Sequence, residues 1–342
     1  MQVKAYAALE RGGPVVPWSF ERREPSPKDV VLEIHYCGVC HSDLHGVGKW
    51  APDFPVVPGH EIVGKVVALG ADVTKFKVGD VAMIGTIVDS CRECEACLAG
   101  DEVYCEKFPT STFGGTDKID GTRTRGGYSS HYVADEHFVY PLPQGLDPAG
   151  AAPLLCAGIT TYSPLKHWKI GPGATVGVVG IGGLGHLGVK FARALGAHVV
   201  AFTTSPAQVE PTLALGAHEV VISKDAKQMA AQARRFDFIL DTIAVPYPMD
   251  PFLAALKRDG TLCAVGIPDR HDFSPMQLAM GRRRIASSGS GGVADTNDML
   301  AFAGKHGIVA QYELVKPDGI MKAWDRMDRG DVQYRFVLDL RS

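Results

Sequence analysis

The spacing of apolar and polar residues divides the chain into regions of different periodicity. Up to about residue 150, short alternating or apolar runs at 30–37, 61–69 and 80–87 are separated by Gly and Pro, with little helical periodicity. These runs predict the strands of an irregular, mostly antiparallel, barrel-like domain.

From about residue 150, apolar runs alternate with segments of helix length. Strands are predicted at 175–179, 199–203, 219–222, 238–241 and 261–265. This alternation is typical of a parallel sheet with helices on both faces, so the expected fold class is α/β with two domains.

After about residue 295 the pattern becomes mixed again, with a predicted helix at 299–305 and a predicted strand at 334–339. We infer that the chain returns to its first domain. The predicted organisation is a mostly β domain of residues 1–155 and 296–342, and a doubly wound α/β domain of residues 156–295.

The composition narrows the range of partners. With 46% hydrophobic and 21% charged residues, the 342-residue chain has the composition of a soluble globular protein. A net charge of −3 creates no field that would attract nucleic acid or an acidic membrane surface. No signal-like segment or run of about 20 apolar residues is present, so we expect a cytoplasmic protein.

Most of the eight cysteines fall into two clusters. Clustered cysteines in a reducing compartment bind metal more often than they form disulfides. The first cluster is a tight loop with a fourth thiol close behind it: Cys91, Cys94, Cys97 and Cys105. Four thiolates leave no vacant position around Zn²⁺, so this spacing predicts a structural zinc site.

A second set of metal ligands comes from three separate segments: Cys40, the pair His60 and Glu61, and Cys156. Mixed sulfur, nitrogen and oxygen ligands suit a zinc that keeps a position for substrate. One closed and one open zinc, two per chain, predict an enzyme.

Polar residues follow Cys40 at short intervals. Ser42 is near enough to pass on a proton from a group at the metal, and His45 can hand that proton to solvent. Asp43 is a candidate to orient the imidazole of His60.

A glycine-rich turn joins the predicted strand 175–179 to a predicted helix at 187–195. It reads Gly180-Ile-Gly182-Gly183-Leu184-Gly185. A strand before and a helix after are the context that the dinucleotide-binding fingerprint requires, because the turn then directs backbone N–H groups toward a pyrophosphate.

The end of the next predicted strand carries hydroxyls instead of a carboxylate, at Thr203, Thr204 and Ser205. An acidic residue there would bind the ribose hydroxyls of NAD(H) and repel a 2′-phosphate. The three hydroxyls therefore favour NADP(H) over NAD(H).

Taken together, these motifs resemble those of the zinc-dependent medium-chain alcohol dehydrogenases, and within them the cinnamyl alcohol dehydrogenase type. The similar motifs span nearly the whole chain and include Cys37-Gly-Val-Cys-His-Ser-Asp43, Val57-Pro-Gly-His-Glu-Ile-Val-Gly64, Gly126-Gly-Tyr128 and Asp331-Val-Gln-Tyr-Arg-Phe-Val-Leu-Asp339. The resemblance implies a GroES-like catalytic domain, a Rossmann domain that holds NADP(H), an active site in the cleft between them, and a homodimer joined near residues 285–292. It further implies interconversion of primary alcohols and aldehydes, aromatic or medium-chain, by hydride transfer.

The resemblance also implies roles for individual residues. Cys40, His60 and Cys156 correspond to catalytic zinc ligands, Glu61 to a replaceable fourth ligand, and Ser42 and His45 to a proton relay. His41 corresponds to a contact with the cofactor pyrophosphate. Apolar residues expected at the substrate or nicotinamide pocket are Trp50, Phe113, Leu155 and Ile267.

Two departures from the family pattern stand out. Gln208 occupies a place where relatives commonly carry a lysine for the 2′-phosphate, which weakens the expected cofactor preference. The small residues of 288–292 replace a large apolar side chain and could widen the pocket or loosen the dimer. Two alternatives stay open: an NAD(H)-dependent secondary-alcohol or polyol dehydrogenase of the same fold, and a non-enzymatic zinc-binding module.

Overall fold

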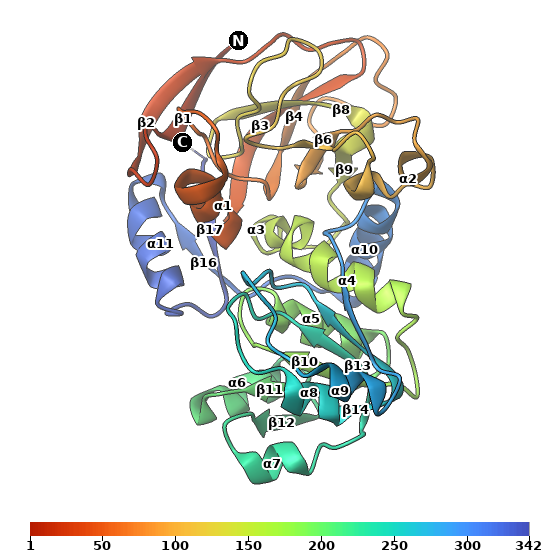
Figure 1. Ribbon diagram of the computed structural model, residues 1–342. Coiled ribbons are helices and arrows are strands. Elements are labelled where there is room, and N and C mark those ends of the chain that lie inside the picture. Colours follow the sequence, from red (N-terminus) through yellow and green to blue (C-terminus); the bar gives the residue numbers. More distant parts are fainter. Residues whose placement is uncertain (342) are drawn as a thin grey trace. The chain divides into compact units, whose positions relative to one another are not determined.

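The computed structural model describes residues 1–341 and separates them into two compact units (Figure 1). The first unit runs from Met1 to Cys156 and resumes at Gly291, while the second comprises Ala157–Ser290. The second unit is thus inserted into the sequence of the first.

The first unit is built on a seven-stranded sheet in which β8 (His131–Asp135) pairs with β3 beside the main path. The strands along that path, in spatial order, are β16 (Tyr312–Val315), β17 (Arg335–Asp339), β3 (Asp29–Val39), β4 (Ile62–Leu69), β5 (Val81–Ile84) and β9 (Val139–Pro141). All pairs are antiparallel except β16 with β17. Two smaller sheets pair β1 (Gln2–Ala8) with β2 (Val15–Glu21), and β6 (Ile87–Asp89) with β7 (Thr110–Ser111).

Helices in the first unit are few. They are α1 (His41–His45), α2 (Glu95–Leu98), α3 (Pro148–Ala151), α10 (Val293–His306) and α11 (Ile320–Asp328). Helix α11 packs Ile320, Ala323, Trp324 and Met327 into the same apolar core as Leu32, Ile34 and Phe336 of the sheet. Their i, i+3, i+4, i+7 spacing is an amphipathic pattern that the sequence analysis did not use.

The second unit is a six-stranded sheet with every neighbouring pair parallel. Its strands, in spatial order, are β12 (Glu219–Ile222), β11 (His198–Thr203), β10 (Thr175–Val179), β13 (Phe236–Asp241), β14 (Leu256–Ala264) and β15 (Arg284–Ser287). Its helices are α4 (Ala157–His167), α5 (Gly185–Ala194), α6 (Val209–Ala214), α7 (Ala226–Ala230), α8 (Asp250–Ala255) and α9 (Pro275–Ala279).

Helices cover both faces of this sheet, as the side-chain alternation of the strands requires. Gly188 of α5 packs against Val178 and Leu240. The adjacent residues Val179 and Ile239 share a core with Phe252 of α8. The predicted α/β fold class is confirmed.

One predicted strand proved to be two. The apolar run at 80–87 forms β5 and β6 with Gly85 and Thr86 between them. The ladder is interrupted because the carbonyls of Gly85 and Thr86 accept hydrogen bonds from the hydroxyl and the N–H of Thr112.

Among residues 1–341, none of the helices combines the length and the apolar composition that a membrane span requires.

Candidate active site and metal centres

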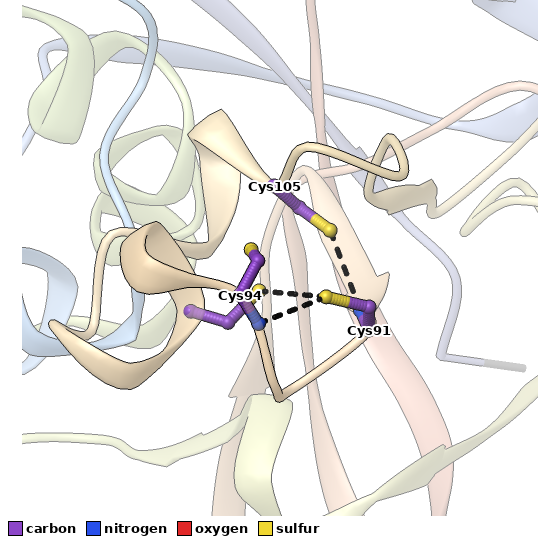
Figure 2. A group of neighbouring side chains, drawn as sticks. Cys91, Cys94 and Cys105 are labelled. Atoms are coloured by element: carbon purple, nitrogen blue, oxygen red, sulfur yellow. Dashed lines mark hydrogen bonds between the residues drawn. The ribbon is translucent and has the colours of Figure 1, made fainter.

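The four-cysteine cluster lies on a lobe that follows β6. The sulfurs of Cys91, Cys94, Cys97 and Cys105 lie within 4.8 Å of one another. The Sγ atoms of Cys91 and Cys97 are 3.8 Å apart. The Sγ of Cys105 accepts a hydrogen bond from the N–H of Cys91 (Figure 2). Four thiolates bound to one Zn²⁺ at about 2.3 Å stand about 3.8 Å apart, so these residues fit a closed zinc site.

The lobe is joined to the rest of its unit through a buried carboxylate. Glu102 accepts hydrogen bonds from the N–H of Val293, at 2.7 Å, and from Nε2 of His137, at 2.8 Å. Val293 is the first residue of α10, where a carboxylate is favoured by the unpaired N–H groups. The cysteine lobe therefore anchors the helix at which the chain re-enters the first unit.

Close packing explains one of the glycines in the segment 288–292, Gly292. A Cβ at this position would lie 2.0 Å from the carbonyl oxygen of Gly100 and 2.6 Å from Cα of Asp101. The glycine is needed so that α10 can begin against the lobe, a packing reason that the sequence analysis did not foresee.

The second metal cluster is assembled from the ends of secondary-structure elements. Cys40 follows β3, His60 and Glu61 precede β4, and Cys156 precedes α4. Their ligand atoms lie within 4.8 Å of one another, with the sulfurs of Cys40 and Cys156 at 4.0 Å. The three predicted segments do converge, and two thiols, an imidazole and a carboxylate are a donor set that fits Zn²⁺.

The two thiols of this cluster differ in how readily they lose a proton. The contact with Cys156 lowers the pKa of Cys40 well below its usual value. The same contact, reinforced by burial, raises the pKa of Cys156. The pair thus shares one readily lost proton and one held proton, and a divalent cation would displace the second.

Asp43 orients the imidazole of His60. Its Oδ1 lies 3.1 Å from Nδ1 of His60 and accepts the N–H of Gly59 at 2.9 Å. A proton on Nδ1 leaves Nε2 with its lone pair for a metal. The geometry agrees with the orienting role expected for Asp43.

Glu61 is fully buried and pairs with Arg335 of β17. Burial raises the pKa of Glu61 to about 7, and the positive charge of Arg335 opposes that rise. Gly38 makes room for this carboxylate, since a Cβ there would lie 1.9 Å from Oε2 of Glu61. Arg335 was missed as a functional residue, because nothing in the sequence relates it to Glu61, 274 residues away.

In the second unit, the glycine-rich turn has the backbone of a phosphate-binding loop. Gly180 has φ of +85°, which favours glycine, and a Cβ on Gly185 would lie 1.9 Å from the carbonyl oxygen of Gly180. Gly182 has open space around its Cα. The turn therefore packs α5 closely on β10 while leaving its middle accessible.

The predicted ribose end of this site lies at the end of β11. Thr203 is buried, Ser205 is half-buried and Thr204 is exposed. Ser205 donates its N–H to Oγ1 of Thr203. The turn that follows carries Gln208, half-buried.

Two family models match this chain. Residues 26–144 match the alcohol dehydrogenase GroES-like domain, and residues 183–305 match the zinc-binding dehydrogenase family. The aldehyde reductase YahK of Escherichia coli is 52% identical over all of this chain and 99% of its own length. The chain belongs to the zinc-dependent alcohol dehydrogenases.

Solved structures support the assignment of this chain to the alcohol dehydrogenases. A cinnamyl alcohol dehydrogenase from Sorghum bicolor has a TM-score of 0.95 and 42% identity, covering 99% of this chain and 98% of its own. The Helicobacter pylori enzyme complexed with NADP(H) has a TM-score of 0.92 and 34% identity, covering 99% and 98%. The chain is therefore an oxidoreductase with a GroES-like domain and a Rossmann domain.

The remaining predicted site residues of this dehydrogenase occupy varied environments. The ring of Phe113 lies 5.7 Å from that of His60, and Leu155 is buried beside Cys156 in the sequence. Trp50 is 60% exposed, with its ring 5.1 Å from that of His45, and Ile267 is 83% exposed in the second unit. These pocket roles stay predictions.

The relay residues lie on one short helix, α1. Burial lowers the pKa of His45, which keeps the imidazole neutral and able to accept a proton near pH 7. His41 is half-exposed and lies 3.6 Å from a carboxylate oxygen of Asp328. No side-chain hydrogen bond joins Ser42 to His45 among the described residues, so the relay stays a prediction as well.

Proposed function

We propose that this enzyme interconverts primary alcohols and aldehydes, aromatic or medium-chain, with NADP(H) as the hydride carrier and two zinc ions per chain. The observation that carries the proposal is the convergence of Cys40, His60 and Cys156, with the buried Glu61 beside them. The same chain carries a dinucleotide-binding turn. The names of the relatives, aldehyde reductase and cinnamyl alcohol dehydrogenase, support this substrate class.

The residues of the second cluster and those around it have different roles in this proposal. Cys40, His60 and Cys156 would hold Zn²⁺, which supplies a Lewis acid for a carbonyl or alcohol oxygen when bound. Asp43 fixes the imidazole of His60. Arg335 pairs with the carboxylate of Glu61, so that Glu61 would be a replaceable ligand of the metal. Ser42 passes a proton between substrate and His45.

NADP(H) is supported by the hydroxyls of Thr203, Thr204 and Ser205 and by the cofactor of the Helicobacter pylori relative. Pyrophosphate binding is proposed at Gly180, Gly182, Gly183, Leu184 and Gly185, with His41 as a further contact. Because Gln208 brings no positive charge, we expect a modest preference: kcat/KM with NADPH should exceed that with NADH. The reverse order would overturn the cofactor assignment.

The substrate class is tested with one panel. Cinnamaldehyde, hexanal, acetone and sorbitol, each assayed with the matching redox form of both cofactors, separate aldehyde reduction from secondary-alcohol and polyol chemistry. We expect the highest kcat/KM for the two aldehydes. Higher values for acetone or sorbitol would replace the proposed substrate class. Metal analysis should find two zinc ions per chain.

We also propose a cytoplasmic homodimer. All eight cysteines are free thiols in the described chain, which suits a reducing compartment. Strand β15 lies at one edge of the second sheet, where it would pair with a strand of a second copy. Light scattering at working concentration tests the dimer, and a monomeric mass would contradict it.

A further inference from the structure

Asp43 is the centre of a fully used set of hydrogen bonds. Its Oδ1 accepts from Gly59 and contacts Nδ1 of His60, while its Oδ2 accepts the N–H of Cys40 at 2.9 Å and the hydroxyl of Tyr128 at 3.1 Å. The carboxylate is completely buried. Each oxygen therefore has two donors, and Tyr128 supplies the one that comes neither from the backbone nor from a metal ligand.

We propose that Tyr128 is a positioning residue for the catalytic metal site, acting on His60 through Asp43. The hydroxyl fixes Oδ2 of the carboxylate, and this sets the direction in which Oδ1 faces the imidazole. The inference rests on the proposed role of His60 as a metal ligand. It extends the control of that ligand to a residue that touches neither metal nor substrate.

The backbone holds Tyr128 in place for this task. Its N–H donates to the carbonyl of Pro58 at 2.9 Å, and its carbonyl accepts from Tyr6 at 2.8 Å. Its ring lies against Gly59, where a Cβ would come within 2.7 Å of Cδ1. The segment that carries His60 is thus packed directly on the tyrosine whose hydroxyl reaches Asp43.

Tyr128 also joins two ligand-bearing segments. Asp43 lies on α1, the helix that begins directly after Cys40, whereas Pro58 and Gly59 directly precede His60. The hydroxyl of Tyr128 contacts the first segment, and its backbone contacts the second. Burial raises the pKa of Tyr128 well above its usual value, so the phenol stays protonated and remains a donor.

A second buried tyrosine provides the matched control. Tyr132 is 1% exposed and its hydroxyl donates to the carbonyl of Thr112 at 2.8 Å, far from any metal ligand in the hydrogen-bond network. Tyr128→Phe and Tyr132→Phe remove the same atom from equally buried sites in the same unit. Only the first change frees an oxygen of a carboxylate that contacts a metal ligand.

The experiment follows metal release from the zinc-loaded enzyme in the presence of a chelator. We expect the wild type to release the zinc of Cys40, His60 and Cys156 readily and the zinc of the four-cysteine cluster slowly. In Tyr128→Phe the readily released zinc should be bound about 10-fold more weakly, with the slow zinc unchanged. In Tyr132→Phe both should behave as in the wild type, even if its melting temperature falls as far.

Two further variants keep the test decisive. In Asp43→Asn, adding Tyr128→Phe should weaken zinc binding no further, because the path through Asp43 is already broken. A 3-fluorotyrosine at position 128 keeps the ring and the donor, and it should bind zinc as the wild type does even if Tyr128→Phe fails to fold.

The outcomes separate two failures. Wild-type zinc affinity in Tyr128→Phe, equal weakening in Tyr132→Phe, or additive effects with Asp43→Asn would overturn the positioning role. A wild-type enzyme that binds only the slow zinc would instead contradict the proposed function itself.

Discussion

The two cysteine-containing clusters differ in how the chain assembles them. Cys91 and Cys105 are 14 residues apart on one lobe, whereas Cys40 and Cys156 are 116 residues apart. Closing the longer loop costs about 2 kcal/mol more in chain entropy. A local cluster can form around its metal, but the distant cluster must be held by the sheet that carries it.

Their surroundings differ as well. The second cluster includes the buried carboxylate of Glu61 and lies beside two further buried charged residues, Asp43 and Arg335, while the first has sulfur ligands alone. Buried charges are costly unless paired, and three of them gather at the second cluster, whereas the lobe of the first carries one, Glu102. This concentration favours the second cluster as the reactive one. Sulfur-only ligation suits stability, and mixed ligation within a charged pocket suits chemistry.

The largest expected effect separates catalysis from folding. Cys40→Ser should lower kcat/KM more than about a thousandfold, because Lewis-acid stabilisation worth several kcal/mol is lost. One zinc per chain should remain, with little change in melting temperature. Cys263→Ser, at a buried thiol outside both clusters, is the control and should keep both zinc ions. Full activity in Cys40→Ser would remove the basis of the comparison.

Arg335→Met tests the buried charge pair. Leaving the carboxylate of Glu61 buried without its cation should destabilise the enzyme by about 3–5 kcal/mol. Adding Glu61→Gln should recover part of that loss, because the orphaned charge is gone. Urea unfolding of the metal-free proteins measures both values. Equal stability of Arg335→Met and wild type would show that the pair is not coupled.

Cys97→Ser should act on stability first. Loss of the structural metal is expected to cost on the order of 3 kcal/mol, or roughly 6–12 °C in melting temperature for a unit of this size. The molecules that stay folded should retain the zinc of the second cluster. Thermal unfolding with metal analysis checks both, and selective loss of the second zinc would reverse the roles assigned to the clusters.

The smallest expected effect concerns the anchor of the lobe. Burial alone would raise the pKa of Glu102, but hydrogen bonds from His137 and Val293 outweigh it and lower the pKa below 4.5. A lowered carboxyl pKa stabilises the fold above pH 4.5, and this stabilisation is lost as the pH falls through the folded-state value.

Glu102→Gln should therefore cost about 1–2 kcal/mol at pH 7, since the amide is a weaker acceptor. The difference from wild type should shrink as the pH falls below 4.5, because the wild-type carboxyl then becomes protonated. Urea unfolding at pH 7, 5 and 4 measures this convergence. A constant difference across the series would mean that the charge of Glu102 contributes nothing.

Local pattern predicted most of the fold. The predicted strands 175–179 and 219–222 coincide with β10 and β12, because buried parallel strands are short apolar runs bounded by turns. The division of 80–87 into β5 and β6 was not predictable, since it depends on Thr112, a residue distant in the sequence. Helix α11 was predictable from its amphipathic spacing but was missed.

The sequence by itself determined which chemistry this protein carries, because ligand types, their local spacing and the glycine turn are properties of short segments. Only the tertiary structure decided that Arg335 pairs with Glu61, that Tyr128 reaches Asp43, and that Glu102 joins the cysteine lobe to α10. Each of these contacts joins residues 85 or more positions apart in the sequence. Such pairings arise from the packing of whole elements, and no local periodicity encodes them.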